Sequence, residues 1–140
     1  MNALKDILVI SIEQAVAAPF CTMRLAESGA RIIKIERKDG DFARYYDQIE
    51  SSDSSYFIWL NQGKESLVLD LRDKSDQNLL KNLLLKADIF VLNLAPESLI
   101  KLCLEPNSLA EKFPNLIICN ISGYSNKTDV YNEKAYDLLI

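Results

Sequence analysis

Five short segments of the chain are rich in β-branched and aliphatic residues, and each predicts a strand. Most of them are continuous apolar runs rather than alternations of apolar and polar positions, which is typical of strands covered on both faces of a parallel sheet. The predicted strands are 7–11, 31–35, 67–71, 89–93 and 116–122.

Helical patterns separate these strands. Pro19, at a first helical position, and Gly29, just past the end, bracket one predicted helix, in line with the preference of proline for helix starts and glycine for helix ends. A second helix begins near Asp73 or Ser75 and repeats leucine along one face. The sequence therefore places helices between the predicted strands.

Two shorter helices follow the fourth predicted strand. One opens at Pro96 and spans 96–102, and the other is capped by Asn107 or Ser108 and must end at Phe113, before Pro114. The long segment 36–66 shows no clear sheet element, although 56–61 could form a turn or two of helix. The alternation of strand and helix predicts an α/β fold, a Rossmann-like parallel sheet with flanking helices, in one domain over residues 1–140.

Composition narrows the classes of function. The 140 residues are 49% apolar and 26% charged, as in ordinary globular domains. The net charge of −4 argues against a nucleic-acid partner, and no apolar run approaches the ~20 residues of a membrane span. The first residues lack the pattern of a signal peptide, so we expect a cytoplasmic protein.

The chain has no histidine, which excludes from it a Ser-His-Asp triad, a Cys-His dyad and a histidine-ligated metal. We expect no metal site. The cysteines, Cys21, Cys103 and Cys119, are widely spaced beside apolar neighbours and are expected to be buried structural thiols. Glu13 and Asp137 are the carboxylates that we consider as a general acid or base.

Ligands of open parallel sheets bind outside the carboxyl ends of the strands, so the residues that follow each strand form the candidate site. The first strand runs into the small-residue turn 13–19 and a helix N-terminus, where free backbone N–H groups favour an anion or a carbonyl. Ordinary strand-to-helix turns have the same composition, so both interpretations stay open. Tyr136 and Asp137 could contact a substrate or merely cap a helix.

Cations recur behind the strands of this acidic chain. Arg37 follows the second strand, Arg72 the third, and Lys101 the helix after the fourth. Guanidinium and ammonium groups suit phosphate oxygens, so the arrangement matches a phosphorylated nucleotide. Each cation could equally be a solvated charge paired with a nearby carboxylate.

The order of several motifs resembles the N-terminal part of the class III CoA-transferase family, the CaiB/BaiF group that includes formyl-CoA transferase and α-methylacyl-CoA racemase. The run GARIIKIER at 29–37 precedes Gly40-Asp41, and the pattern N-x-x-K-x-S-x-x-L-D-L occupies 61–71. Further matches are Ala17-Ala18-Pro19, Lys86-Ala87-Asp88 and Ile121-Ser122-Gly123-Tyr124. Racemases of the family have a catalytic histidine where Tyr136 stands, so this tyrosine favours the transferase branch.

The resemblance implies that coenzyme A, as acyl-CoA, is the ligand and that a small carboxylic acid is its co-substrate. Residues that look like the CoA contacts of the family are Arg37, Leu69, Arg72, Asn93, Lys101 and Lys134. Residues that look like those near the acyl group are Gln14, Val16, Tyr46, Tyr56, Tyr136 and Asp137.

In the family, an aspartate carboxylate attacks the thioester to give a mixed anhydride and free CoA, before CoA passes to an acceptor carboxylic acid. Family chains are much longer, so the resemblance places that aspartate beyond residue 140. We therefore expect no catalytic residue in this chain, exposed apolar surface, and a homo-oligomer or a partner chain that supplies the remainder. Other interpretations stay open: a non-catalytic CoA- or nucleotide-binding remnant, or an α/β interaction domain.

Overall fold

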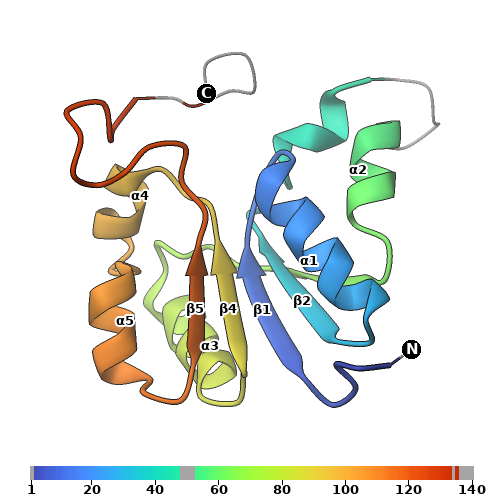
Figure 1. The fold of residues 1–140 in the computed structure, drawn as a ribbon, viewed down its shortest axis with the longest axis horizontal. Coiled ribbons are helices and arrows are strands. Elements are labelled where there is room, and N and C mark those ends of the chain that lie inside the picture. The colour runs from blue at the N-terminus through green and yellow to red at the C-terminus, as the bar shows by residue number, and fades with distance from the viewer. Residues whose placement is uncertain (1, 48–52, 134, 136–140) are drawn as a thin grey trace.

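The computed structural model describes residues 2–47, 53–133 and 135. In this part of the chain, parallel strands form one sheet with the order β3-β2-β1-β4-β5 (Figure 1). The central strand β1 therefore has β2 on one side and β4 on the other. The strands are β1 (Leu8–Ile12), β2 (Arg31–Glu36), β3 (Lys64–Val68), β4 (Ile89–Leu92) and β5 (Ile117–Asn120).

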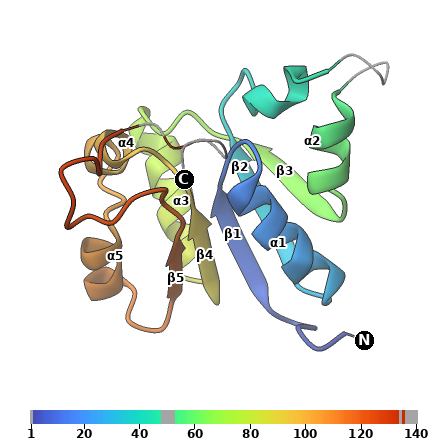
Figure 2. The same ribbon diagram turned by 45° about the horizontal axis from the view of Figure 1, so that its top comes forward.

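Helices cover both faces of the sheet. One face packs against α1 (Ala17–Glu27), beside which lie α2 (Ser55–Leu60) and a 3₁₀-helix, η1 (Phe42–Tyr45). The turned view in Figure 2 shows α1 and α2 side by side, away from the other three helices. Those three, on the second face, are α3 (Lys74–Leu84), α4 (Pro96–Lys101) and α5 (Pro106–Lys112).

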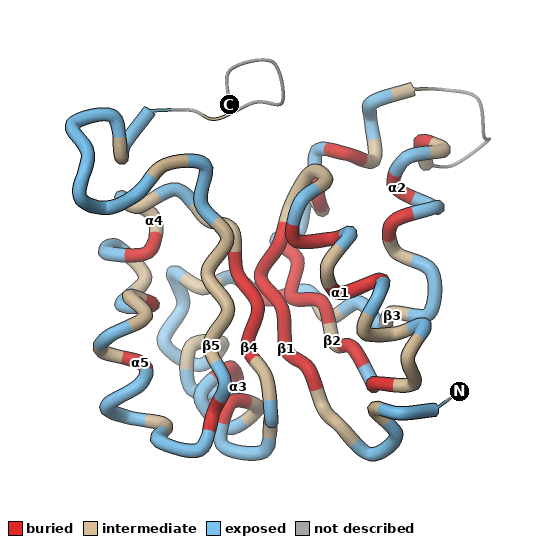
Figure 3. The backbone as a smooth tube through the Cα atoms, viewed as in Figure 1, coloured by how far each residue is buried: buried red, intermediate tan, exposed pale blue. Residues whose placement is uncertain are grey.

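The core follows from the two-residue period of the central strands. On β1, Ile10 points to the α3 side, where it joins Phe90 and Leu80, and Val9 points to the α1 side, where it joins Ala18. Figure 3 shows that burial concentrates along β1 and β4. The predicted α/β class with a parallel sheet is therefore confirmed.

One predicted strand was misplaced. The third strand spans 64–68 rather than 67–71, so the segment 36–66, in which no sheet element was expected, contains the start of β3. β3 is an edge strand whose partner is β2, with Lys64 opposite Ile32 and Ser66 opposite Lys34. Polar residues are acceptable on an edge strand, and a search for apolar runs passes over them.

The helices agree with the prediction except at the N-termini of α1 and α5. α3 is capped by Asp73 and α4 opens at Pro96, as predicted. α1 begins at Ala17, two residues before Pro19, and α5 has Glu105 as its N-cap rather than Asn107 or Ser108, since Pro106 takes the first helical position. The predicted 56–61 helix is α2.

The expectation of buried thiols was wrong for Cys103, which is exposed, while Cys21 and Cys119 are half-buried. Cys103 lies in the turn after α4 with a φ of 54°, so its position in a tight reversal keeps it at the surface. Among the described residues, no helix is both long and apolar enough to cross a membrane.

Candidate functional site

The carboxyl ends of β1 and β4 form the switch point of the sheet. The chain leaves β1 toward α1 on one face and leaves β4 toward α4 on the other, so the loops that follow these strands diverge there (Figure 1). Open α/β sheets bind their ligands at this place. The topology alone therefore directs attention to residues 13–16 and 93–95.

Asn93 joins these two loops. Its side-chain Oδ1 accepts a hydrogen bond from the backbone N–H of Gln14 at 3.0 Å, and its Nδ2 donates to the Gln14 carbonyl at 2.9 Å. Both backbone groups of Gln14 are thus held by a residue at the end of β4. Asn93, a predicted CoA contact, has a structural partner within the chain.

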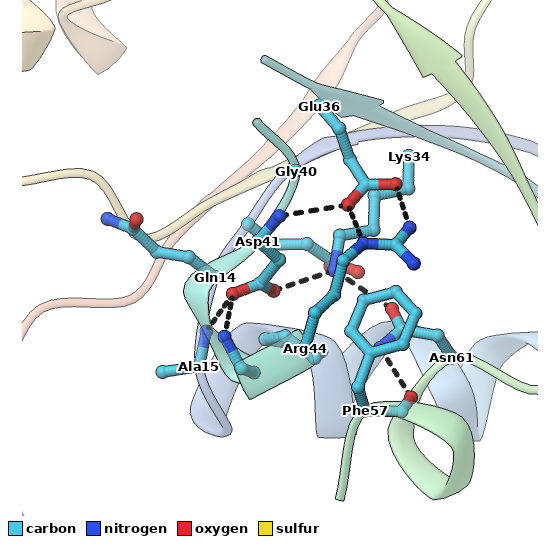
Figure 4. Close-up of polar contacts among 12 residues, drawn as sticks. Gln14, Ala15, Lys34, Glu36, Gly40, Asp41, Arg44, Phe57 and Asn61 are labelled. Carbon is cyan, nitrogen blue, oxygen red and sulfur yellow. Dashed lines mark hydrogen bonds and ion pairs between the residues drawn. The ribbon is translucent and has the colours of Figure 1, made fainter. Parts of the chain in front are cut away.

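Asp41 holds the next residue of the β1 loop. Its side chain is fully buried, and Oδ1 accepts from the backbone N–H of Ala15 at 3.2 Å and of Ala43 at 3.0 Å (Figure 4). Ala15 has a φ of 62°, a left-handed conformation that is rare for a residue with a side chain. The loop is therefore fixed by Asn93 on one side and Asp41 on the other.

Buried lysines complete the support behind this loop. Lys34 Nζ, on β2, donates to Asp41 Oδ2 at 2.8 Å and to Asn61 Oδ1 at 2.9 Å (Figure 4). Lys64 Nζ, on β3, donates to Glu13 Oε1 at 2.7 Å, and Glu13 also accepts from Thr22. Burial lowers the pKa of the Lys64 ammonium, and the Glu13 carboxylate offsets only part of that effect.

Glu13, considered above as an acid or base, is thus an ion-pair partner. Its carboxylate is buried and is occupied by Lys64 and Thr22. It stands behind the loop as part of the support rather than at the open edge.

A second ion-pair group lies next to the first. Glu36 accepts from Arg44 Nη2 at 2.9 Å and from the Ser66 hydroxyl, and Arg44 also pairs with Asp53 at 2.9 Å. The Arg44 guanidinium lies 3.8 Å from the centre of the Phe57 ring. Burial raises the pKa of the Glu36 carboxyl, but the hydrogen bonds from Arg44 and Ser66 more than offset this, so the pKa lies below its usual value.

Exposed aromatic side chains lie beyond these groups on α1, η1 and α2. Tyr46, the C-cap of η1, has its ring 6.3 Å from that of Tyr56 on α2. Further ring contacts, edge-on or tilted, extend the series, which runs Phe42, Tyr46, Tyr56, Trp59 and Phe20. The predicted acyl-side residues Tyr46 and Tyr56 are therefore together. Gln14 and Val16 flank Ala15, which Asp41 links to Ala43 in η1.

The predicted phosphate-binding cations differ in their availability. Arg37 is exposed and its Nε donates to the Gly40 carbonyl at 3.2 Å, with no ion pair to any residue that the structure describes. Arg72 forms a two-bond contact with Asp70, and these hydrogen bonds lower the pKa of Asp70 to about 2. Lys101 lies 3.5 Å from Glu97. Of these three cations, Arg37 is thus the one without an ion pair to a described residue, which leaves it available to an anionic ligand.

The remaining predicted residues are apolar or lie outside the described part. Leu69 follows β3 and is buried, with its N–H donating to the Glu36 carbonyl at 2.9 Å. Val16 is half-buried as the N-cap of α1 and offers no side-chain cap. Lys134, Tyr136 and Asp137 lie outside the described residues. No cluster of acidic or thiol side chains suited to a metal occurs in the described ranges.

Neither of two surface hollows is lined by the switch-point loops 13–16 and 93–95. An open pocket of about 630 Å³ lies between α4, α5 and the segment after β5, and none of the predicted site residues lines it. A smaller one of about 110 Å³ lies over Lys34, Lys64 and Phe57. We give the switch point more weight, because the backbone contacts from Asp41 and Asn93 converge there.

Sequence reasoning missed the buried charges. Lys34 and Glu36 stand two apart on β2, so they share one face of the strand with the buried Ile32. Opposite charges two residues apart in a buried strand were the sequence signal that could have identified these buried charges. Asp41 was visible only as part of a matching motif, without a role.

Proteins of similar sequence include CoA-transferases. The succinyl-CoA:mesaconate CoA-transferase of Haloarcula hispanica is 34% identical, in an alignment that covers 99% of this chain and 37% of that protein. The acetyl-CoA:oxalate CoA-transferase of Acetobacter aceti is 35% identical, over 96% of this chain and 35% of that protein. The chain thus spans little more than a third of the length of these relatives.

Solved structures show the same fold. The crystal structure of a CaiB/BaiF family protein from Brucella suis matches with a TM-score of 0.90 and 28% identity, covering 99% of this chain and 38% of the other. A hypothetical protein from Mycobacterium tuberculosis matches with a TM-score of 0.85 and 30% identity. Residues 4–140 match CoA-transferase family III, and the chain belongs to that family.

Proposed function

We propose that this chain is the CoA-binding, N-terminal portion of an acyl-CoA:carboxylate CoA-transferase. The observation that carries the proposal is the switch point between β1 and β4, where Asn93 and Asp41 fix the backbone of the β1 loop in a chain of this family. Relatives that act on succinyl-CoA or acetyl-CoA support acyl-CoA as the ligand class.

The cations would bind the phosphates of CoA. Arg37 stands at the carboxyl end of β2 without an ion-pair partner among the described residues, so its guanidinium can form hydrogen bonds to phosphate without first breaking an ion pair. Arg72 and Lys101 would have to loosen their contacts with Asp70 and Glu97. Lys134 completes the proposed set.

The acyl group would lie between the β1 loop and the aromatic side chains. Gln14 and Val16 contribute from the loop, and Tyr46 and Tyr56 from the aromatic series. We include Tyr136 and Asp137 by their sequence match alone. Leu69, buried behind β3, would pack beneath the nucleotide.

We assign the covalent step to a part of the protein outside this chain. There, an aspartate carboxylate would form a C–O bond to the thioester carbonyl carbon while the C–S bond breaks and CoA leaves as the thiolate. This chain would hold the CoA and orient the thioester. Completion by a second copy or by a chain that carries the remainder belongs to the same proposal.

Calorimetric titration with CoA at low salt tests the binding. We expect saturable binding that Arg37→Ala weakens by about 10-fold or more, because hydrogen bonds between charged groups are among the strongest. Arg31→Ala is the matched control, since Arg31 opens the same strand at its opposite end and pairs with Glu65 at the surface. Equal affinity of the wild type and Arg37→Ala would contradict the phosphate role of Arg37, and a folded chain that binds no CoA would contradict the proposed function.

A further inference from the structure

We propose that Asp41 is a positioning residue that sets the protein's preference for an acylated CoA over free CoA. The inference rests on the proposed function and deepens it. Asp41 does not itself reach the open edge of the sheet, because its side chain is fully buried. It acts through the two backbone segments that it joins.

One carboxylate oxygen links two parts of the acyl side. Asp41 Oδ1 accepts from Ala15, which stands between Gln14 and Val16, and from Ala43 in η1, whose C-cap is Tyr46 (Figure 4). The β1 loop and the 3₁₀-helix are distant in sequence, and this oxygen fixes one against the other. Movement of either segment would stretch a hydrogen bond to a buried charge.

The other carboxylate oxygen secures Asp41. Oδ2 pairs with Lys34 Nζ, which also donates to Asn61, the C-cap of α2. α2 carries Tyr56, whose ring contacts that of Tyr46. Asp41, Lys34 and Asn61 therefore connect the β1 loop, η1 and α2 through one series of buried and partly buried charge-assisted hydrogen bonds.

The conformation of Ala15 shows that the loop is held against its own preference. A left-handed φ of 62° is unfavourable for alanine and persists only where surrounding contacts impose it. Asp41 and Asn93 supply those contacts on the two sides of the same peptide segment. Such conformations concentrate at ligand sites, where they fix geometry before the ligand arrives.

The turn at Ala15 directs the chain into α1. The N-cap, Val16, offers no side-chain hydrogen bond, so no side-chain cap engages the backbone N–H groups of the first turn. A thioester carbonyl is an acceptor suited to such donors. Asp41 thereby controls the part of the site that meets the acyl group and leaves the phosphate contacts to the cations.

The test compares acetyl-CoA with CoA as ligands of wild type and Asp41→Asn by calorimetry. We expect wild type to prefer acetyl-CoA by about fivefold, the gain expected for three further ligand atoms, and Asp41→Asn to bind the two ligands equally. The ratio of the affinities for acetyl-CoA and CoA is independent of any general effect of the lost charge on phosphate binding, because both ligands carry the same phosphates. Asp53→Asn, which loses a charge at the Arg44 pair without touching the β1 loop, should keep the preference.

Amide hydrogen exchange provides a second readout in the same chain. Asparagine has one acceptor oxygen where Asp41 has two, and the buried Lys34 ammonium requires it, so the Ala15 N–H should lose its acceptor. The Ala15 N–H should therefore be protected in wild type and should exchange at least about tenfold faster in Asp41→Asn than in Asp53→Asn. If Asp41→Asn fails to fold, the test uses wild type and Asn93→Ala. Slow exchange of the Ala15 N–H in wild type, together with loss of the preference for acetyl-CoA in Asn93→Ala, supports the proposal. Fast exchange of that N–H in wild type, or an intact preference in Asn93→Ala, overturns it.

The outcomes separate the two proposals. Wild type that binds neither ligand contradicts the proposed function and, with it, the ligand role of Asp41. Wild type that prefers acetyl-CoA, combined with the same preference in folded Asp41→Asn, leaves the proposed function standing and overturns the positioning role alone.

Discussion

At the scale of single residues, the buried ion pair of Lys34 with Asp41 predicts a large loss of stability on substitution. Lys34→Met leaves the Asp41 carboxylate buried without its counter-charge, which should lower the free energy of unfolding by about 3–5 kcal/mol. Urea denaturation followed by circular dichroism measures this. Arg31→Met, which breaks an exposed pair with Glu65, should cost no more than about 1 kcal/mol, and equal losses in the two variants would contradict the prediction.

Glu36 predicts a dependence of stability on acid. Its pKa in the folded protein lies below the usual 4.5, despite burial, because Arg44 and Ser66 donate to the carboxylate. Its contribution is therefore complete above the unfolded pKa and is lost as the pH falls through the lower, folded value. The urea midpoint of wild type should drop below about pH 4.5 more steeply than that of Glu36→Gln, and parallel pH profiles would refute this role.

At the scale of elements, the start of α3 depends on one side chain. Asp73 accepts from the N–H of Ser75, and hydrogen bonds from Ser75 lower the pKa of Asp73. Asp73→Ala should reduce the free energy of unfolding by about 0.5–2 kcal/mol. Asp73→Ser retains a cap and should recover most of the loss in the same urea experiment, whereas two equally unstable variants would show that capping is not the cause.

The strands differ in how well the sequence predicts their positions. β1 and β4 are nearly continuous apolar runs, and their positions were predictable because both faces of a central strand must be covered. β2 was predictable from Ile32, Ile33 and Ile35, although its other residues are charged. β3 was misplaced because an edge strand tolerates Lys64, Glu65 and Ser66. The pattern of apolar positions predicts where a strand lies. It does not predict a charged side chain that is buried together with its ion-pair partner.

The candidate site was predictable in part for a related reason. The rule for ligand sites in open sheets identified the β1 loop and the strand ends, and the structure places Asn93 and Arg37 there. The role of Asp41 required the fold, because its contacts with Ala15 and Lys34 join segments that no local pattern connects. Long-range hydrogen bonds carry no periodic signal in the sequence.

At the scale of the whole molecule, the unpaired side of the edge strand β5 predicts self-association of the isolated chain. β5 pairs only with β4 among the described residues, and its Ile117 is 63% exposed. An unpaired edge that carries an apolar side chain favours pairing with another chain.

Sedimentation velocity across a concentration series should therefore show a dimer that Ile117→Lys weakens by about 10-fold or more, because an isoleucine contributes roughly 1.5–3 kcal/mol when its side chain becomes buried. Ile100→Lys is the matched control: Ile100 is 62% exposed, on α4 rather than on the sheet edge, and its replacement should leave the dimer intact. A wild-type chain that stays monomeric, or equal weakening by the two lysines, would show that β5 is not the associating edge. If only Ile117→Lys acts, the edge of β5 is the surface that another chain must cover in the assembled protein.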